Sequence, residues 1–486
     1  MSSKGGKPSD PKKQKTPPPL AEDLKMTDDS AMMDVPTVVN STEFDFDGYL
    51  QRYQGVTKVR RLMFIAERCP GLQVAAFRRA IDELKTSMNT QLYVECVSRA
   101  RELLGDKLGD DWGLDQKWKG SQERKAQDAI VRLEANLASS KRDEGREPVR
   151  KAFAAMAQFY MERGEYASAL TKYLECKECA TTNAHHLQTC LDIIKASIHM
   201  GTMTHVKNQA QRAQSIPDLR NDQSSQALIN AANGLYNLKS ASYRAAAQSF
   251  LATTDHVTKH NDVISIQDVA VYSCLTALAS YPRRELKQVV SSDTFKRMVE
   301  QAPVWKKVIS DFHANNYAAV FATLEGLKVC AHSMTSQPEL YMDMYLSAHV
   351  DKLIMKIRDK ALMEYFKPFV SVKISLMAES FKVPMLDLEK QLVSLIADSK
   401  ISARIDSANK VLYARHADER SGTFEKALGV GDKYIRDAKS MLLRMSLTEN
   451  DFVVRTPDHE RRLKQRKEQG DKDKLDGGKD AMMSMS

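Results

Sequence analysis

The sequence predicts a mainly α-helical protein in which repeated helical hairpins precede a small mixed domain and one long terminal helix. Only 20 glycines and 15 prolines occur among 486 residues, and 42% of the residues are hydrophobic. This composition suits helices that bury sizeable cores. Apolar residues recur at helical spacing through most of the chain, whereas alternation at period two stands out near residue 400. We therefore expect a helical scaffold that carries one β-hairpin.

Charge is distributed unevenly along the chain. The net charge is +9, but residues 21–47 carry eight acidic residues against one Lys, so that the first 47 residues sum to −3. Residues 455–486 sum to +2, which leaves +10 for residues 48–454. So mild a bias falls short of the dense basic surface of a dedicated nucleic-acid-binding protein. No run of 18 apolar residues predicts a membrane span, and seven scattered Cys suit a reducing compartment.

Both ends of the chain are poor in apolar periodicity. Residues 1–42 are rich in Lys, Pro, Asp and Ser, and residues 451–486 are highly charged. Because such segments bury too little surface to offset the entropy of ordering, we predict two disordered tails. The Arg/Lys cluster of the second tail is either a nuclear-import or polyanion patch or simply solvated charge.

A repeated helical hairpin is clearest in AMAQFYMERGEYASALTKYLEC, residues 155–176. Gly164 separates two apolar stripes, with small residues at the helix contacts and aromatic residues in the gaps, as in tetratricopeptide repeats. The pattern recurs at spacings of 37, 40 and 74 residues. The corresponding positions are Ala169, Val206, Ala246 and Val320. We predict a tetratricopeptide-like, right-handed α-solenoid over residues 43–338.

Other helices flank the repeats. Residues 58–85 predict two short helices separated at Cys69-Pro70, because proline disfavours helix in the residue before it. A longer helix is expected from about residue 119 to 142. From residue 339 a single long helix is expected to end before Pro368, followed by two shorter helices.

These two shorter helices are expected to begin near Ser371 and Pro384, and a β-hairpin follows them. Ile401, Ala403 and Ile405 alternate with polar residues, a turn-prone Asp-Ser-Ala-Asn follows, and a second strand is expected from Val411. Three helices and a two-stranded wing are typical of a winged-helix domain, which we place at residues 339–416.

The wing could bind nucleic acid, or its edge could pair with another protein. The helix that would enter the major groove, residues 384–400, has three acidic and two basic residues, so phosphates would repel it. The unpaired backbone N–H and C=O groups at the edge of a β-hairpin can instead form hydrogen bonds with a strand of another subunit, which is strand addition. We favour the edge, and its predicted interface residues are Ile401, Ala403, Arg404, Ile405, Val411 and Tyr413.

A last helix is predicted over residues 417–450. Its apolar residues, together with Gly431, recur at alternating spacings of four and three residues over three heptads. This spacing is typical of the a and d positions of a coiled coil, and we call the stripe the seam. The helix either folds onto its own domain or joins other helices in a bundle, and we favour the bundle. The predicted seam residues are Phe424, Leu428, Ile435, Ala438, Leu442 and Met445.

The sequence lacks the usual signatures of a catalytic or metal site. The 11 His form neither H-x-H nor H-E-x-x-H, and the lone Cys176-Lys-Glu-Cys179 has no second pair at zinc-site spacing. Gly429–Gly431 lacks the other parts of a phosphate loop. We predict no catalytic, cofactor-binding or metal-binding residues and no cofactor.

Five stretches resemble a known family. RRLMFIAERCP (60–70), MYLSAHVDKLIMKIRDKALMEYFKPFVS (344–371), Leu392–Ile396, ISARIDSANKVLYAR (401–415) and RSGTFEKAL (420–428) resemble PCI-domain proteins, and within them the family of COP9 signalosome subunit 1. The first and last stretches distinguish this family from its paralogue in the 26S proteasome lid.

The resemblance implies a non-catalytic scaffold in a complex that removes the ubiquitin-like protein Nedd8 from cullins, in cytoplasm and nucleus. It implies signalosome subunits 2 and 3 as neighbours, cullin-RING ligases as partners through the complex, and no membrane. It also implies that the PCI domains of the subunits join at their edges and that the terminal helices of the subunits form a common bundle. A proteasome-lid subunit and an RNA-associated PCI protein of translation or mRNA export are the alternatives.

Overall fold

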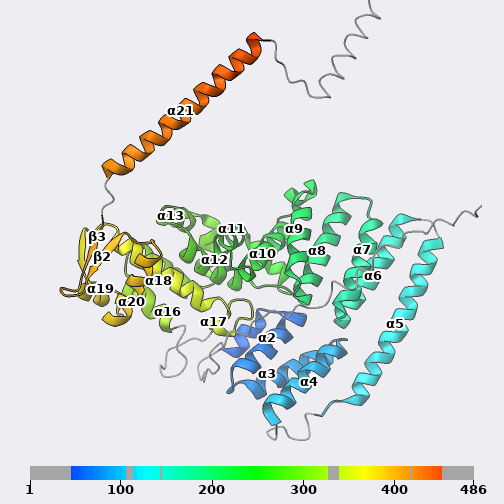
Figure 1. Ribbon diagram of the computed structural model, residues 1–486. Helices are drawn as coiled ribbons and strands as arrows, with labels where there is room; N and C mark the ends of the chain where they lie inside the picture. The colour runs from blue at the N-terminus through cyan, green and yellow to red at the C-terminus, as the bar shows by residue number, and fades with distance from the viewer. Residues whose placement is uncertain (1–44, 106–112, 143–144, 327–338, 416–418, 451–486) are drawn as a thin grey trace, which may run out of the picture. The chain divides into compact units, whose positions relative to one another are not determined.

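The computed structural model describes residues 45–105, 113–142, 145–326, 339–415 and 419–450. They form mostly α-helices (Figure 1), which confirms the predicted mainly α class. The chain divides into two compact units, one that ends at Leu395 and one that begins at Ile396. The predicted disordered tails, residues 1–42 and 451–486, lie outside the described residues.

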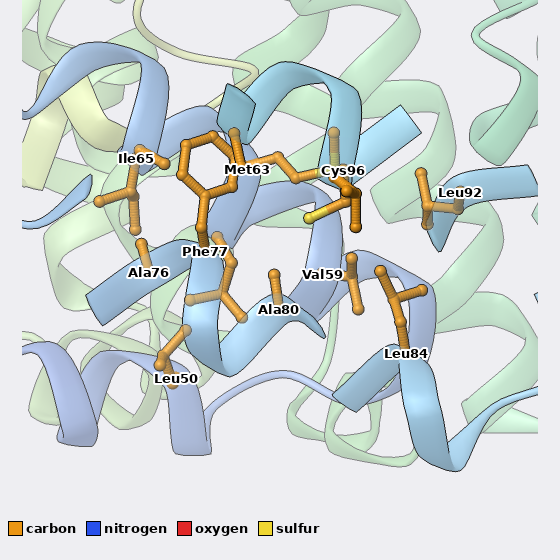
Figure 2. Close-up of a cluster of buried hydrophobic side chains, with 14 of the residues drawn as sticks. Leu50, Val59, Met63, Ile65, Ala76, Phe77, Ala80, Leu84, Leu92 and Cys96 are labelled. Atoms are coloured by element: carbon orange, nitrogen blue, oxygen red, sulfur yellow. The ribbon is translucent and has the colours of Figure 1, made fainter. Parts of the chain in front are cut away.

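Four helices form the N-terminal part: α1 (Phe46–Gln51), α2 (Gly55–Arg68), α3 (Gln73–Thr86) and α4 (Thr90–Leu104). Cys69 is extended between α2 and α3, as expected for a residue that precedes proline. Figure 2 shows the core that these helices share, with Ile65, Phe77 and Leu84 directed into it. Met342, from a distant part of the sequence, belongs to the same core.

Helices α5 to α12 follow one another, and each packs against the next. Two 3₁₀ turns, η3 (Pro217–Asn221) and η4 (Asp255–His260), interrupt the series. This succession is the predicted solenoid of helical hairpins. The helices are α5 (Gln116–Arg142), α6 (Arg146–Arg163), α7 (Tyr166–Glu178), α8 (Asn183–Met200), α9 (Met203–Gln214), α10 (Gln223–Lys239), α11 (Tyr243–Leu251) and α12 (Ile266–Ser280).

The hairpins are held by the small residues that the repeat pattern predicts. Gly164 ends α6 with a φ of 84°, a left-handed conformation that favours glycine. Gly234 of α10 lies against the ring of Phe250 of α11, where a Cβ would stand 2.4 Å from a ring carbon. Four predicted contact positions have no exposed surface: Ala169, Val206, Ala246 and Val320.

Four shorter helices continue the chain after the solenoid: α13 (Arg283–Ser291), α14 (Asp293–Glu300), α15 (Pro303–His313) and α16 (Tyr317–Gly326). Farther along, α18 (Val350–Phe366) packs against α12. There the buried Lys360 donates a hydrogen bond of 2.8 Å from Nζ to the carbonyl oxygen of Leu278. This contact anchors the C-terminal part of the first unit to the solenoid.

The prediction of a single long helix from residue 339 is wrong. The chain forms α17 (Glu339–Met342) and α18 (Val350–Phe366), with a turn between them. Oδ1 of Asp343 accepts the backbone N–H groups of Tyr345 and Leu346 at 2.9 and 3.0 Å. Such side-chain acceptance competes with helical hydrogen bonding and breaks the helix.

Ser371 does not begin a helix as expected. A strand, β1 (Ser371–Lys373), precedes α19 (Ile374–Phe381). The ring of Phe381 stacks on Tyr317 of α16, with centroids 5.2 Å apart and planes 5° apart, which holds α19 against the preceding helices. Helix α20 (Met385–Ala397) begins after Pro384 as predicted.

The C-terminal unit contains β2 (Ala403–Asp406), β3 (Val411–Ala414) and α21 (Glu419–Glu449). The two strands pair antiparallel, with Ala403 opposite Ala414 and Asp406 opposite Val411. The hairpin and the terminal helix therefore form where the sequence predicts them.

Candidate assembly surfaces

Helix α21 carries the predicted seam on an uncovered face. It has 31 residues and is about 46 Å long at 1.5 Å per residue. Phe424 is 65% exposed and Leu442 is 66% exposed, and Leu428, Ile435 and Met445 are also exposed. Ala438 and Gly431 are half-buried. Large apolar side chains exposed along one helix face mark an interaction surface.

A second apolar stripe on α21 was missed by the sequence prediction. Val430, Tyr434 and Met441 are all exposed, and at 100° per residue they lie beside the seam. Together the two stripes span roughly 160° of the helix circumference. A two-stranded coiled coil uses the narrower a/d seam, so a face this wide fits contact with more than one helix. The same helical periodicity, applied beyond the a/d positions, would have found it.

Gly431 lies within the seam. A Cβ at this position would meet no other atom of the described residues within 4 Å, apart from the adjacent backbone of α21 itself. Glycine inside a helix costs roughly 0.5–1 kcal/mol relative to alanine, and it permits close approach of another backbone. The described residues therefore leave the space beside Gly431 open.

The turn of the hairpin is built around Asp406. Its Oδ1 accepts the backbone N–H groups of Ala408 and Asn409 at 3.0 and 3.3 Å, and its Oδ2 accepts the side-chain amide of Asn409 at 2.9 Å. These bonds, the one from the Asn409 side chain foremost, lower the pKa of the Asp406 carboxyl. Lys410 completes the turn with a φ of 52°. The turn-prone residues therefore act as the sequence indicates.

The two faces of the hairpin differ. Ile401 and Ala403 are buried, and Ile405 and Val411 are half-buried. Arg404 and Tyr413 stand opposite each other on the exposed face. Of the six predicted interface residues, these two can therefore offer whole side chains to a partner, whereas Ile401 and Ala403 can contribute only through the backbone.

The backbone of β2 is available for hydrogen bonds to a partner strand, because β2 lies at one edge of the sheet. The N–H of Arg415 donates to the carbonyl oxygen of Ser402 at 2.8 Å. Hydrogen-bonded and non-hydrogen-bonded pairs alternate in an antiparallel ladder, so the polar backbone groups of Ala403 and Ile405 point away from β3. An edge of this kind can pair with another strand.

Helix α20 does not resemble a helix that binds DNA. Lys390 Nζ lies 3.8 Å from an Asp387 oxygen, and Lys400 Nζ, just after the helix, lies 3.0 Å from Asp398. Its exposed apolar residues are Leu386 and Val393. Acidic and apolar side chains on this surface favour a protein partner over phosphate.

A buried ionic cluster joins the N-terminal helices to the rest of the first unit. Arg61 of α2 has no exposed surface, and its guanidinium lies 2.8 Å from Asp268 of α12 and 2.7 Å from Asp343. Tyr53 and Tyr272 donate to the two carboxylates at 2.6 Å each. Burial alone would lower the pKa of Arg61, but the two carboxylates outweigh it and hold the pKa well above its usual range.

Arg60, the neighbouring residue, binds α8. Its guanidinium donates to the carbonyl oxygen of His199 and lies 5.3 Å from the ring centroid of Tyr166. The His199 ring stacks on Tyr166 at 5.6 Å. Burial, together with the charge of Arg60, lowers the pKa of His199 to about 4. The Arg60-Arg61 pair thus fixes α2 to three separate parts of the chain.

The described residues contain no group of three or more His, Cys, Asp or Glu side chains that could hold a metal ion. Cys176 is buried and Cys179 is half-buried, and both are free thiols. None of the described helices is long and apolar enough to cross a bilayer.

Three family models match the chain. They are 26S proteasome subunit RPN7 over residues 115–289, the PCI domain over residues 327–416, and the C-terminal helix of COP9 signalosome complex subunit 1 over residues 420–445. COP9 signalosome complex subunit 1 of Arabidopsis thaliana is 38% identical over 86% of this chain and 93% of its own length. The chain belongs to the COP9 signalosome subunit 1 family.

Two further relatives are a signalosome subunit and a proteasome subunit. COP9 signalosome complex subunit 1b of Drosophila melanogaster is 30% identical over 86% of the chain and 88% of its own length. The 26S proteasome non-ATPase regulatory subunit 6 of Dictyostelium discoideum is 21% identical over 75% of the chain. The predicted PCI domain and the predicted family are thus confirmed, and membership implies partnership with other subunits of the signalosome.

Proposed function

We propose that this chain is a non-catalytic scaffold subunit that supports removal of Nedd8 from cullins in cullin-RING ubiquitin ligases. The observation that carries the proposal is the uncovered apolar face of α21, in the segment matched by the C-terminal helix of the subunit 1 family. In this proposal the zinc isopeptidase belongs to another subunit, and this chain needs no cofactor. The complex works in cytoplasm and nucleus.

Two surfaces would divide the task of assembly. The wide face of α21 would enter a bundle of terminal helices, where its exposed leucines and aromatic residues become buried. The edge of β2 would pair with the PCI domain of a neighbour, for which signalosome subunits 2 and 3 are the expected candidates. The acidic and apolar surface of α20 supports protein contact over the RNA-binding alternative.

The bundle is tested by Leu428→Asp together with Leu442→Asp. Both side chains are more than half exposed, so the variant chain should keep its own thermal stability. A buried charge without a partner is costly, so we expect the variant to leave the signalosome during co-purification. Nedd8 removal by the reconstituted complex should fall in parallel.

A matched control uses the opposite side of the same helix. Lys426→Asp with Ser440→Asp adds two carboxylates at the same 14-residue spacing, and both positions are exposed. This variant should co-purify with all partners. If the Leu428 and Leu442 variant also retained every partner, the bundle assignment would be wrong.

The strand edge is tested by Ala403→Pro. Proline removes the N–H group that points away from β3 and leaves the ladder to β3 intact. We expect a weaker contact with one neighbouring subunit, by about 1 kcal/mol for one lost hydrogen bond. Arg404→Ala, which changes only an exposed side chain, should have a smaller effect. Pull-down of subunits 2 and 3 at graded concentrations measures both, and equal binding by Ala403→Pro and the wild type at unchanged thermal stability would contradict strand addition.

A further inference from the structure

A groove with lysines at its rim is formed by α13, α14 and α15. Its residues precede those of both proposed assembly surfaces in the sequence. Its volume is about 580 Å³. The buried side chains of Phe295, Val299 and Ile309 line it, together with the half-buried Val290. The groove therefore combines an apolar lining with an exposed rim, and this rim is basic. Its charged residues are Lys287, Lys296 and Lys306 against Glu300.

A second hollow of about 580 Å³ adjoins the first, because Lys287 and His313 line both. It adds Arg283, Arg284 and Lys367 against Glu364. The two hollows together have six basic and two acidic residues, a formal charge of +4 with His313 neutral. Within the part of the chain that the structure describes, no ion pair is recorded for Lys287, Lys306 or Lys367. A basic apolar groove of this kind attracts an acidic segment that also carries apolar side chains.

The chain itself contains such a segment. Residues 21–44 carry six acidic residues and one Lys, a net charge of −5. Apolar residues are interspersed with the acids, as in SAMMDVPTVV at residues 30–39. The segment therefore matches the groove in charge and in apolar character.

The position of α1 brings this segment within reach. Tyr49 and Arg52, in and just after α1, line one cavity together with Trp305 of α15. Ile309, one turn farther along α15, lines the groove. The 17 residues from Asp45 back to Asp28 span up to about 60 Å when extended. A tether of this length gives an effective concentration on the order of millimolar.

We propose that residues 21–44 dock into the groove of α13 to α15, with carboxylates on the lysine rim and apolar side chains on the buried lining. The segment would thereby cover an apolar surface in the free subunit. This inference does not depend on the proposed function in the signalosome.

The test uses hydrogen exchange of the full chain. One variant converts the six acids of residues 21–44 to Asn or Gln, and another carries Lys287→Glu with Lys306→Glu. Backbone amides of residues 283–314 should exchange about tenfold faster in both variants than in the wild type, as expected when a tethered ligand of modest affinity is lost. Lys117→Glu with Lys125→Glu on α5, where both lysines are exposed, is the matched control and should resemble the wild type.

Charge reversal separates docking from loss of fold. Changing the six acids to Lys in a chain that carries Lys287→Glu, Lys296→Glu, Lys306→Glu and Lys367→Glu, which reverses the charge of the two hollows from +4 to −4, should restore slow exchange. Carbodiimide, which joins carboxylates to contacting amines, should link residues 21–44 mainly to Lys287, Lys296 and Lys306 within one chain. Unchanged exchange in the neutralised variant would overturn the proposal. Links spread evenly over surface lysines, or links that form only between chains, would do the same.

Discussion

The Arg61 cluster and the face of α21 both depart from the usual distribution of side chains, but in opposite directions. A guanidinium lies with no exposed surface in the first unit, whereas Phe424 and Leu442 stand about two-thirds exposed in the second. Charged groups are rarely fully buried unless paired, and large apolar patches rarely remain exposed on a monomer.

The difference between the two regions shows which is complete within the chain. Asp268, Asp343 and the tyrosine hydroxyls near Arg61 satisfy one another through hydrogen bonds of 2.6–2.8 Å. The apolar face of α21 has no comparable complement among the described residues, since its side chains remain exposed. We therefore expect the first region to contribute to the stability of the subunit and the second to contribute to its association.

The largest effect on stability is expected for Arg61→Ala. The variant would leave Asp268 and Asp343 buried beside each other without a counter-charge. Removal of one partner from a buried ion pair costs about 3–5 kcal/mol, so the free energy of unfolding should fall by about this amount. Denaturant unfolding of the isolated chain measures it.

Arg244→Ala provides the control for Arg61→Ala. Arg244 lies 2.9 Å from Glu285, but both side chains are more than one-third exposed. An exposed pair contributes about 0–1 kcal/mol, so this variant should unfold close to the wild type. A loss below about 1 kcal/mol for Arg61→Ala as well would contradict the assigned role of the cluster.

Most of the helical framework could be predicted from the sequence because its signals are local. Gly164 marks a hairpin turn and positions 169, 206 and 246 mark helix contacts by spacing alone. Gly164 ends α6 as predicted, and the three contact residues are buried. Asp406 and Asn409 likewise determine a turn within four residues. Such features need no information from distant parts of the chain.

The break at Asp343 could not be predicted in this way. The residue lies within a strong helical pattern, yet its carboxylate binds Arg61, which is 282 residues away. The stretch RRLMFIAERCP supported the family resemblance without showing that its second arginine is a buried centre. The proposed assembly surfaces show a similar limit. Periodicity predicted a stripe of apolar residues on α21, and most of them are exposed, but burial of Ile401 and Ala403 depends on packing that their alternation alone does not specify.

A smaller effect on stability is expected when the pH is lowered and His199 becomes protonated. This residue is a second buried group, and it contacts α2 through Arg60. Its folded pKa is about 4 against about 6.5 in an unfolded chain. The folded state therefore favours the neutral ring. As pH falls from 6.5 to 4, the unfolded state binds the proton first and stability decreases, by about 3 kcal/mol in total. His199→Asn should remove this contribution.

The wild type must be compared with His199→Asn because Asp192 changes the pH dependence of stability in the opposite direction. Burial raises the pKa of its carboxyl to about 6, so this residue favours the folded state as pH falls below 6. The wild-type curve alone therefore combines both effects. Unfolding free energies of wild type and His199→Asn, measured from pH 7 to 5, should diverge toward acid, and parallel curves would contradict a buried neutral His199.

The smallest effect is expected for Gly431→Leu in α21, and it separates association from stability most directly. A Cβ at this position would meet no other atom of the described residues within 4 Å beyond the adjacent backbone of α21, and the same holds for Gly429 on the opposite side of the helix. Replacing either glycine should raise the helicity of α21 and stabilise it by roughly 0.5–1 kcal/mol. Only Gly431→Leu should weaken incorporation into the signalosome, because its side chain occupies the space that a neighbouring helix would use. Circular dichroism and competitive assembly against the wild type measure the two effects. Equal incorporation of the Gly429 and Gly431 variants would show that helices do not approach closely at this face.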